Sequence, residues 1–214
     1  MREKLKLLSR VMQVGILVVA AVGIATHNLA WVPAAVISFF VTMIPSIAKR
    51  DLGFVLPLEL SFWVVAALFL HVVGGAAGLY TSLPGWDHLT HIMSASLIGA
   101  LGFVLVVVLD KYVDSIYLPP PFLAFFIAMF TMAVGVLWEI MEFANDSIAH
   151  TQLQYGLSDT MYDLMFDGFA GLVVAFAGAR YLKRMSPEHF VESLGIDDAK
   201  ERVSAIVGRR KRVV

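Results

Sequence analysis

The chain contains six apolar runs that are each long enough to cross a lipid bilayer, and this feature limits its fold more than any other. Crossing about 30 Å of hydrocarbon requires roughly 20 residues of α-helix. The bilayer interior offers no water to unpaired backbone groups, so such runs are expected to be helices. We place them near residues 10–26, 29–48, 52–73, 88–109, 122–145 and 160–182. The sequence therefore predicts an all-α, polytopic membrane protein with six transmembrane helices.

Composition supports a bilayer location, because 59% of the residues are hydrophobic and only 15% are charged. Cysteine is absent, which excludes disulfides and thiolate metal sites. The first run is short and follows a basic start, as a cleavable signal would. We expect a retained helix instead, because the run exceeds a usual signal core and no clean small-x-small cleavage site ends it.

Lysine and arginine fall on one side only of the six-span topology. They precede the first span, join the second to the third and the fourth to the fifth, and lie at or beyond the end of the sixth: Arg2, Lys4, Lys6, Arg10, Lys49, Arg50, Lys111 and the residues from Arg180 onward. Basic loops stay in the cytoplasm, so we expect both termini to be cytoplasmic. Residues 27–28, 74–87 and 146–159 are then outward-facing, and the expected location is the plasma membrane.

We predict one membrane domain over residues 1–184 and a basic cytoplasmic tail over residues 185–214. Pro33, Pro45 and Pro57 fall within predicted spans, where we expect kinks. Residues 188–207 are expected to form an amphipathic helix, and the basic run at 209–212 would be drawn to anionic lipid headgroups. Membrane lipids are thus the expected partners. A nucleic-acid role is not expected, since a positive cytoplasmic end is what the topology already requires.

Seven carboxylates lie near the outer ends of the last three spans, on the side that holds no lysine or arginine. They are Asp87, Glu139, Glu142, Asp146, Asp159, Asp163 and Asp167, accompanied by His88 and His91. An acid at a helix centre costs about 2.5 to 3.5 kcal/mol on insertion scales, and less near the interface. Their charges could be neutralised by a bound metal ion or by bound protons. For the acids of any one helix taken alone, hydration by water at the outer interface would be a sufficient explanation.

Helical spacing predicts that these residues meet. The acids of the fifth span share one stripe, the aspartates of the sixth span repeat at i, i+4 and i+8, and the fourth span opens with an acid and a histidine one turn apart. Three helices therefore present acid and imidazole to one outer-leaflet pocket. The predicted metal ligands are Asp87, His91, Glu142, Asp146, Asp159, Asp163 and Asp167, and the predicted acid/base residues are Glu139 and His88.

The ligand chemistry narrows the choice of ion. Carboxylates suit Mg²⁺, Mn²⁺ or Ca²⁺, while one or two imidazoles shift the preference toward Mn²⁺, Fe²⁺ or Zn²⁺. We expect a divalent ion such as Mg²⁺, Mn²⁺ or Zn²⁺, with protons as the alternative. His71, near the outer end of the third span, either joins this pocket or extends to the interface.

Three function classes remain open. The first is a metal-dependent hydrolase or transferase that acts on a lipid-borne or headgroup-like substrate. The second is a cation- or proton-coupled transporter or channel. Glu59 is the only strong candidate for a further cation- or proton-binding residue deeper in the membrane. Spans four and six are apolar below Ser96 and Asp167, which disfavours a continuous path. The third is a membrane scaffold with a structural ion.

Three segments resemble the YjdF-type family of small integral membrane proteins, and more distantly VanZ-like proteins. They are residues 86–91 (WDHLTH), 137–142 (LWEIME) and 154–167 (QYGLSDTMYDLMFD). The resemblance covers about residues 86–179, with no correspondence for the first two spans. It implies that the aspartate and glutamate positions form a shared site, and it supplies no reaction.

Overall fold

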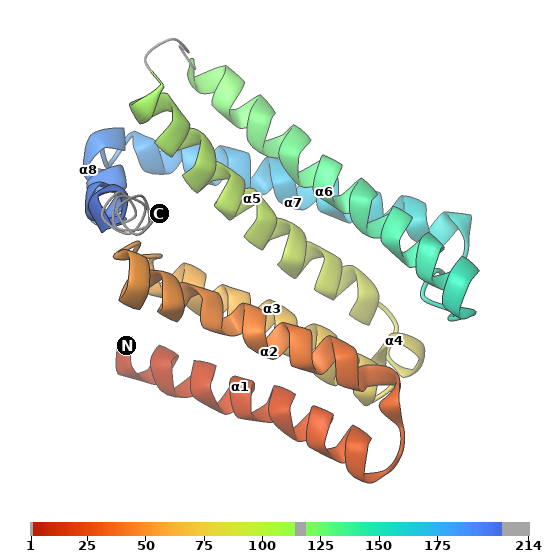
Figure 1. Ribbon diagram of the computed structural model, residues 1–214. Helices are drawn as coiled ribbons and strands as arrows, with labels where there is room; N and C mark the ends of the chain where they lie inside the picture. Colours follow the sequence, from red (N-terminus) through yellow and green to blue (C-terminus); the bar gives the residue numbers. More distant parts are fainter. Residues whose placement is uncertain (1, 114–118, 203–214) are drawn as a thin grey trace, which may run out of the picture. The chain divides into compact units, whose positions relative to one another are not determined.

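Figure 1 shows the computed structural model, which describes residues 2–113 and 119–202; its regular secondary structure is helical, with no strand in this part of the chain. Six of its helices are long and apolar enough to cross a membrane. The prediction of an all-α, polytopic membrane protein is therefore confirmed. The helices form two compact units: Met1–Leu79 together with Pro187–Val214, and Tyr80–Ser186.

The first unit is built from three long helices, α1 (Arg2–Ala25), α2 (Val32–Ile47) and α3 (Leu58–Ala76). A short 3₁₀ turn (Leu29–Trp31) leads into α2, and a π-helical segment (Ala48–Leu52) follows it. The three helices pack on one another around Ile16, Ala20, Ala35 and Val72, all of which are buried. This core is apolar and small, as expected where helix backbones approach closely in a bilayer.

The structure corrects the expected proline kinks. Pro33 lies in the first turn of α2 and Pro57 immediately precedes α3. In those places proline removes no intrahelical hydrogen bond, so the prediction of kinks there is wrong. Pro45 alone of these three lies inside a helix, and the π-helical segment begins three residues later.

The C-terminal region folds back on the loop between α2 and α3. Helix α8 (Pro187–Ser193) is followed by a turn at 194–195 and by further helix at 196–202. The Val55 N–H donates to the Leu194 carbonyl at 2.7 Å, and the Arg202 guanidinium donates to the Arg50 carbonyl at 3.3 Å. The continuous helix expected over 188–207 is thus interrupted, and the basic run at 209–212 lies outside the described residues.

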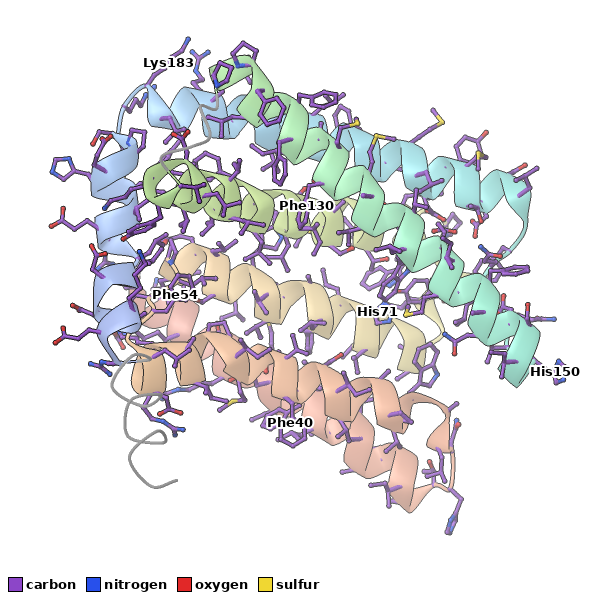
Figure 2. All side chains as sticks on the ribbon, turned by 45° about the horizontal axis from the view of Figure 1, so that its top comes forward. Phe40, Phe54, His71, Phe130, His150 and Lys183 are labelled. Carbon is purple, nitrogen blue, oxygen red and sulfur yellow. The ribbon has the colours of Figure 1, made fainter. Side chains whose placement is uncertain are left out.

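The second unit contains the last three spans, α5 (Trp86–Tyr112), α6 (Pro120–Ala149) and α7 (Leu157–Leu182), preceded by the short α4 (Leu79–Ser82). Each long helix packs against the other two. Lys183 and His150 mark opposite ends of this unit (Figure 2). Its lysines and arginines all belong to the Lys183 end, because they lie in or just after the last turns of α5 and α7: Lys111, Arg180, Lys183 and Arg184.

Candidate metal centre

The predicted acids gather at the end of the second unit where α5 and α7 begin and α6 ends. Gly85 immediately precedes α5 with φ 81°, and Gly156 precedes α7 with φ 125°. Both conformations favour glycine, and they fix where the two helices start. Asp87 and Asp159 consequently lie in the first turns of α5 and α7, where the helix dipole stabilises negative charge.

His91 lies at the centre of this group, with only 7% of its surface exposed. Its Nδ1 is 3.2 Å from Oδ1 of Asp167, which is also buried. An ionised carboxylate only accepts, so Nδ1 donates in this contact, and a metal ion would be bound through Nε2. This is the arrangement by which a carboxylate orients a metal-binding histidine. Nε2 lies 3.8 Å from Asp87 Oδ1 and 4.0 Å from Glu139 Oε1.

A second histidine–aspartate pair runs alongside the first. His88 Nδ1 lies 3.2 Å from Oδ1 of Asp163, a residue with only 2% of its surface exposed. The His88 ring also packs against Phe166, with ring centroids 4.6 Å apart. Its side chain is 34% exposed, so His88 is partly accessible while its partner Asp163 is buried.

Three side chains form a group that has the spacing of metal ligands: Asp87, His91 and Asp163. Each offers one ligand atom, and these atoms all lie within 4.8 Å of one another. Two atoms that bind one ion at about 2.0 to 2.2 Å cannot be more than roughly 4.4 Å apart. Small side-chain rotations are therefore enough to bring all three onto a single ion.

Glu139 supplies the clearest sign that a cation belongs here. Only 5% of its surface is exposed, and its Oε2 accepts a hydrogen bond from Gln154 Nε2 at 3.3 Å. Its Oε1 is buried and has no hydrogen-bond partner among the residues that the structure describes. Leaving a buried carboxylate oxygen without a donor is costly, and a metal ion would remove that cost. The donor set therefore fits a divalent cation.

The floor of the site depends on small residues. A Cβ placed on Gly135, one turn before Glu139 on α6, would collide with Asp167 Oδ2. Farther from the site, the Thr131 side chain lies against Gly99 of α5 and Gly171 of α7. A Cβ added to either glycine would lie only 3.0 to 3.1 Å from Thr131. The three helices thus touch directly below the acids.

The remaining predicted ligands have other partners. Glu142 Oε1 accepts from Trp138 Nε1 at 2.9 Å. Asp146 accepts the Thr151 hydroxyl and the backbone N–H groups of Leu153 and Gln154, and Asp159 accepts the Tyr155 N–H. The last two aspartates hold the loop between α6 and α7, and none of the three belongs to the close group. Their role as metal ligands stays a prediction.

Two tyrosines lie near these carboxylates, outside the spanning helices. Burial raises the pKa of Tyr80, with further increases from the charges of Asp87 and Glu142, while its hydroxyl donates to Thr90 at 3.4 Å. Burial also raises the pKa of Tyr155, again with Asp87 contributing. Both phenols therefore stay protonated at neutral pH and offer hydrogen-bond donors close to the acids.

Two residues of the site, Gly135 and Gln154, were not predicted from the sequence. Gly135 lies one turn from Glu139 on the same stripe, so the close approach of α7 at that point was detectable from spacing. Gln154 lies in an irregular loop with no periodic pattern, so only the fold reveals it. His71 belongs to the first unit, and its participation in the pocket stays a prediction.

Comparison with known proteins places the chain among predicted membrane proteins. Residues 7–184 match the family described as "Predicted membrane protein (DUF2238)". A Thermotoga maritima relative named "Uncharacterized protein" is 32% identical over 115 residues, which are 52% of this chain and 57% of the relative. The alignment thus spans little more than half of the relative. No solved structure matches.

The family match agrees with the membrane-protein class that the resemblance implies, and it extends over the first two spans as well. It confirms neither the YjdF-type nor the VanZ-like name.

Proposed function

We propose that this chain, which belongs to the DUF2238 family of predicted membrane proteins, binds a divalent metal ion and uses it to transform a headgroup-like substrate at the membrane surface. One observation carries the proposal. His91 Nε2 lies 3.8 Å from an Asp87 oxygen and 4.0 Å from a Glu139 oxygen, and both distances are too long for hydrogen bonds. A cation at their centre resolves this arrangement.

Asp87, His91 and Asp163 are the proposed ligands, with Asp167 orienting His91. Two carboxylates and one imidazole favour Mn²⁺ or Zn²⁺ over Mg²⁺ among the ions expected from the sequence. Three protein ligands leave coordination positions for water and substrate, which is typical of catalytic rather than structural sites.

The proposed chemistry is a hydrolysis or group transfer. A bound ion would polarise a phosphoryl or carbonyl oxygen and lower the pKa of a bound water. His88 is the proposed acid/base residue, because its ring is held by Asp163 and yet remains partly exposed. Glu139 is too deeply buried to exchange protons readily with a substrate.

An enzyme is favoured over a transporter by the packing below the site. Thr131 of α6 packs against Gly99 and Gly171, and in the described part of α6 and α7 no acidic residue lies before Glu139 or after Asp167. Glu59, the candidate for a further cation- or proton-binding residue of a transporter, belongs to the first unit and is exposed in the first turn of α3. The site is therefore best suited to a ligand that enters and leaves at one end.

The charge around the site favours a substrate with an ammonium group. One divalent ion leaves several carboxylates without an opposing charge, among them Glu142 and Asp159, which lie outside the group of proposed ligands. The nearest lysine along α5 is Lys111, 20 residues beyond His91 and about 30 Å away along a regular helix. In a zwitterionic headgroup, the phosphate would bind the metal and the ammonium group would lie near the carboxylates. Such a headgroup suits the negative electrostatic potential around the site better than a purely anionic one.

We also propose that the site faces outward from the plasma membrane, with both termini in the cytoplasm. In each unit the basic residues lie at one end of the helices. In the second unit that end is opposite to the site, so the retention of basic loops in the cytoplasm supports this orientation.

The test uses the full chain purified in detergent without chelators. We expect about one Mn²⁺ or Zn²⁺ per chain by elemental analysis, and a melting temperature that falls on EDTA treatment and recovers with the metal. His91→Ala should lose both effects, whereas Asp110→Asn, near the other end of α5, should keep them. A wild-type protein without bound metal, and without stabilisation by any of Mg²⁺, Mn²⁺ or Zn²⁺, would refute the proposal.

Activity is tested with vesicles. The metal-loaded protein should convert phosphatidylethanolamine faster than phosphatidylglycerol, and His88→Gln should reduce turnover while metal binding is retained. Equal turnover of the two lipids would exclude the proposed headgroup preference, and unchanged turnover in His88→Gln would exclude its acid/base role.

A further inference from the structure

Among the described residues, Glu139 is the carboxylate that has a buried oxygen without a hydrogen-bond partner. Oε2 is bound by Gln154, whereas Oε1 is buried, has no hydrogen-bond partner among the described residues, and lies 4.0 Å from His91 Nε2. A carboxylate that served only to hold the fold would be expected to find donors for both oxygens. The oxygen without a partner is thus the one that lies near His91 Nε2.

Gln154 accounts for this asymmetry. Its side-chain nitrogen lies 3.3 Å from Glu139 Oε2, 3.2 Å from the Glu139 carbonyl and 3.2 Å from the Thr160 hydroxyl. The carbonyl and carboxylate oxygens only accept, so this atom must be the donating NH₂ group. One amide therefore ties the Glu139 side chain, the α6 backbone and the first turn of α7 together.

The Gln154 backbone is held in turn by Asp146. The Asp146 carboxylate accepts the N–H groups of Leu153 at 2.8 Å and of Gln154 at 2.9 Å. A continuous set of hydrogen bonds thus runs from the loop between α6 and α7 to Glu139 Oε2, on the same carboxylate whose other oxygen lies beside His91. Asp146 acts at the far end of this set, which explains an acid outside the close group.

We infer that Glu139 is a fourth ligand of the metal and that Gln154 is its positioning residue. This inference rests on the proposed metal site and changes the role that the sequence suggests for Glu139, from acid/base residue to ligand. Three carboxylates and one imidazole would then bind the ion. By holding Oε2, Gln154 leaves Oε1 to face the ion, as outer residues do for ligands in metal sites.

The experiment measures Mn²⁺ affinity by titration calorimetry on the full chain in detergent, together with the melting temperature of the metal-free protein. Glu139→Gln keeps the shape of the side chain and removes its charge, and it should weaken Mn²⁺ binding at least about 100-fold. Gln154→Ala should weaken binding about 10-fold, the lower end of the usual effect of an outer residue. Gln152→Ala, an exposed glutamine of the same loop, is the matched control and should bind as the wild type does.

The outcomes separate the two proposals. If the wild type binds no Mn²⁺, the proposed function fails first. If the wild type binds Mn²⁺ and Glu139→Gln binds it equally well, Glu139 is not a ligand and only this inference is overturned. If Gln154→Ala lowers the melting temperature of the metal-free protein without changing affinity, Gln154 supports the loop alone and its positioning role is refuted.

Discussion

The two units of the chain are each built on three long apolar helices, yet they place polar groups very differently. In the described part of the first unit, the buried polar residues are Ser38 and Thr42, which carry no charge. In the second unit they include His91, Glu139, Asp163 and Asp167. Both units could be held together by apolar and small-residue packing alone. The buried charges of the second unit therefore require a reason other than folding.

Within the first unit, polar contacts serve packing. The Gln13 amide of α1 donates to the Thr42 hydroxyl of α2 at 3.1 Å, a neutral bond between two helices. Such bonds in membrane proteins contribute on average about 0.6 kcal/mol. In the second unit, by contrast, the two histidine–aspartate pairs leave further carboxylates without a positively charged partner. The comparison indicates that the buried acids of the second unit lower its folding stability and are present because they form a binding site. The following predictions test this difference between the units.

The largest effect is expected for Asp163→Asn. The asparagine oxygen can still accept from His88, so the neighbouring hydrogen bond survives while a buried charge and a metal ligand are lost. Metal affinity should fall at least about 100-fold, beyond the usual effect of outer residues. The metal-free protein should melt at the same or a higher temperature. Thermal unfolding with and without Mn²⁺ measures both quantities, and a lower metal-free melting temperature would indicate that Asp163 serves the fold instead.

A matched pair of glycine substitutions gives the next largest effect. Gly135→Ala in α6 would force a Cβ against Asp167, and Gly75→Ala in α3 would force one against the Trp31 ring. Overpacking of this kind typically costs about 1 to 3 kcal/mol. Both variants should be destabilised, but only Gly135→Ala should also weaken Mn²⁺ binding, because Asp167 orients His91. Equal metal affinity in the two variants would contradict the proposed role of Asp167.

Sequence patterns were sufficient to predict the six membrane helices and the helix faces on which the acidic residues lie. A run of some 20 apolar residues has few structural solutions in a bilayer, and i, i+4 spacing puts aspartates on one face in any regular helix. Thus Asp163 and Asp167 could be assigned to one stripe, and His91 to the helix opposite.

The partners within the site could not be obtained in the same way. Whether His91 meets Asp167 or Asp163 depends on the rotation of α5 against α7, which is set by contacts such as Gly99 with Val174. Asp159 and Asp146 follow the same spacing as the buried acids, yet they bind backbone groups of a loop whose course no periodicity encodes. Spacing therefore predicts which face a residue occupies, whereas its partner depends on the tertiary packing.

The smallest effect is expected for Gln13→Leu in the first unit. Leucine has nearly the volume of glutamine and removes the donor to Thr42, while the Thr42 hydroxyl keeps its own bond to the Phe39 carbonyl at 2.6 Å. No buried charge is exposed by this change, so the unfolding free energy should move by less than about 1 kcal/mol. Mn²⁺ affinity should be that of the wild type. Calorimetric titration of this variant beside Asp163→Asn checks the comparison directly: a loss of metal binding in Gln13→Leu would mean that the first unit takes part in the site, and the contrast between a packing unit and a binding unit would no longer hold.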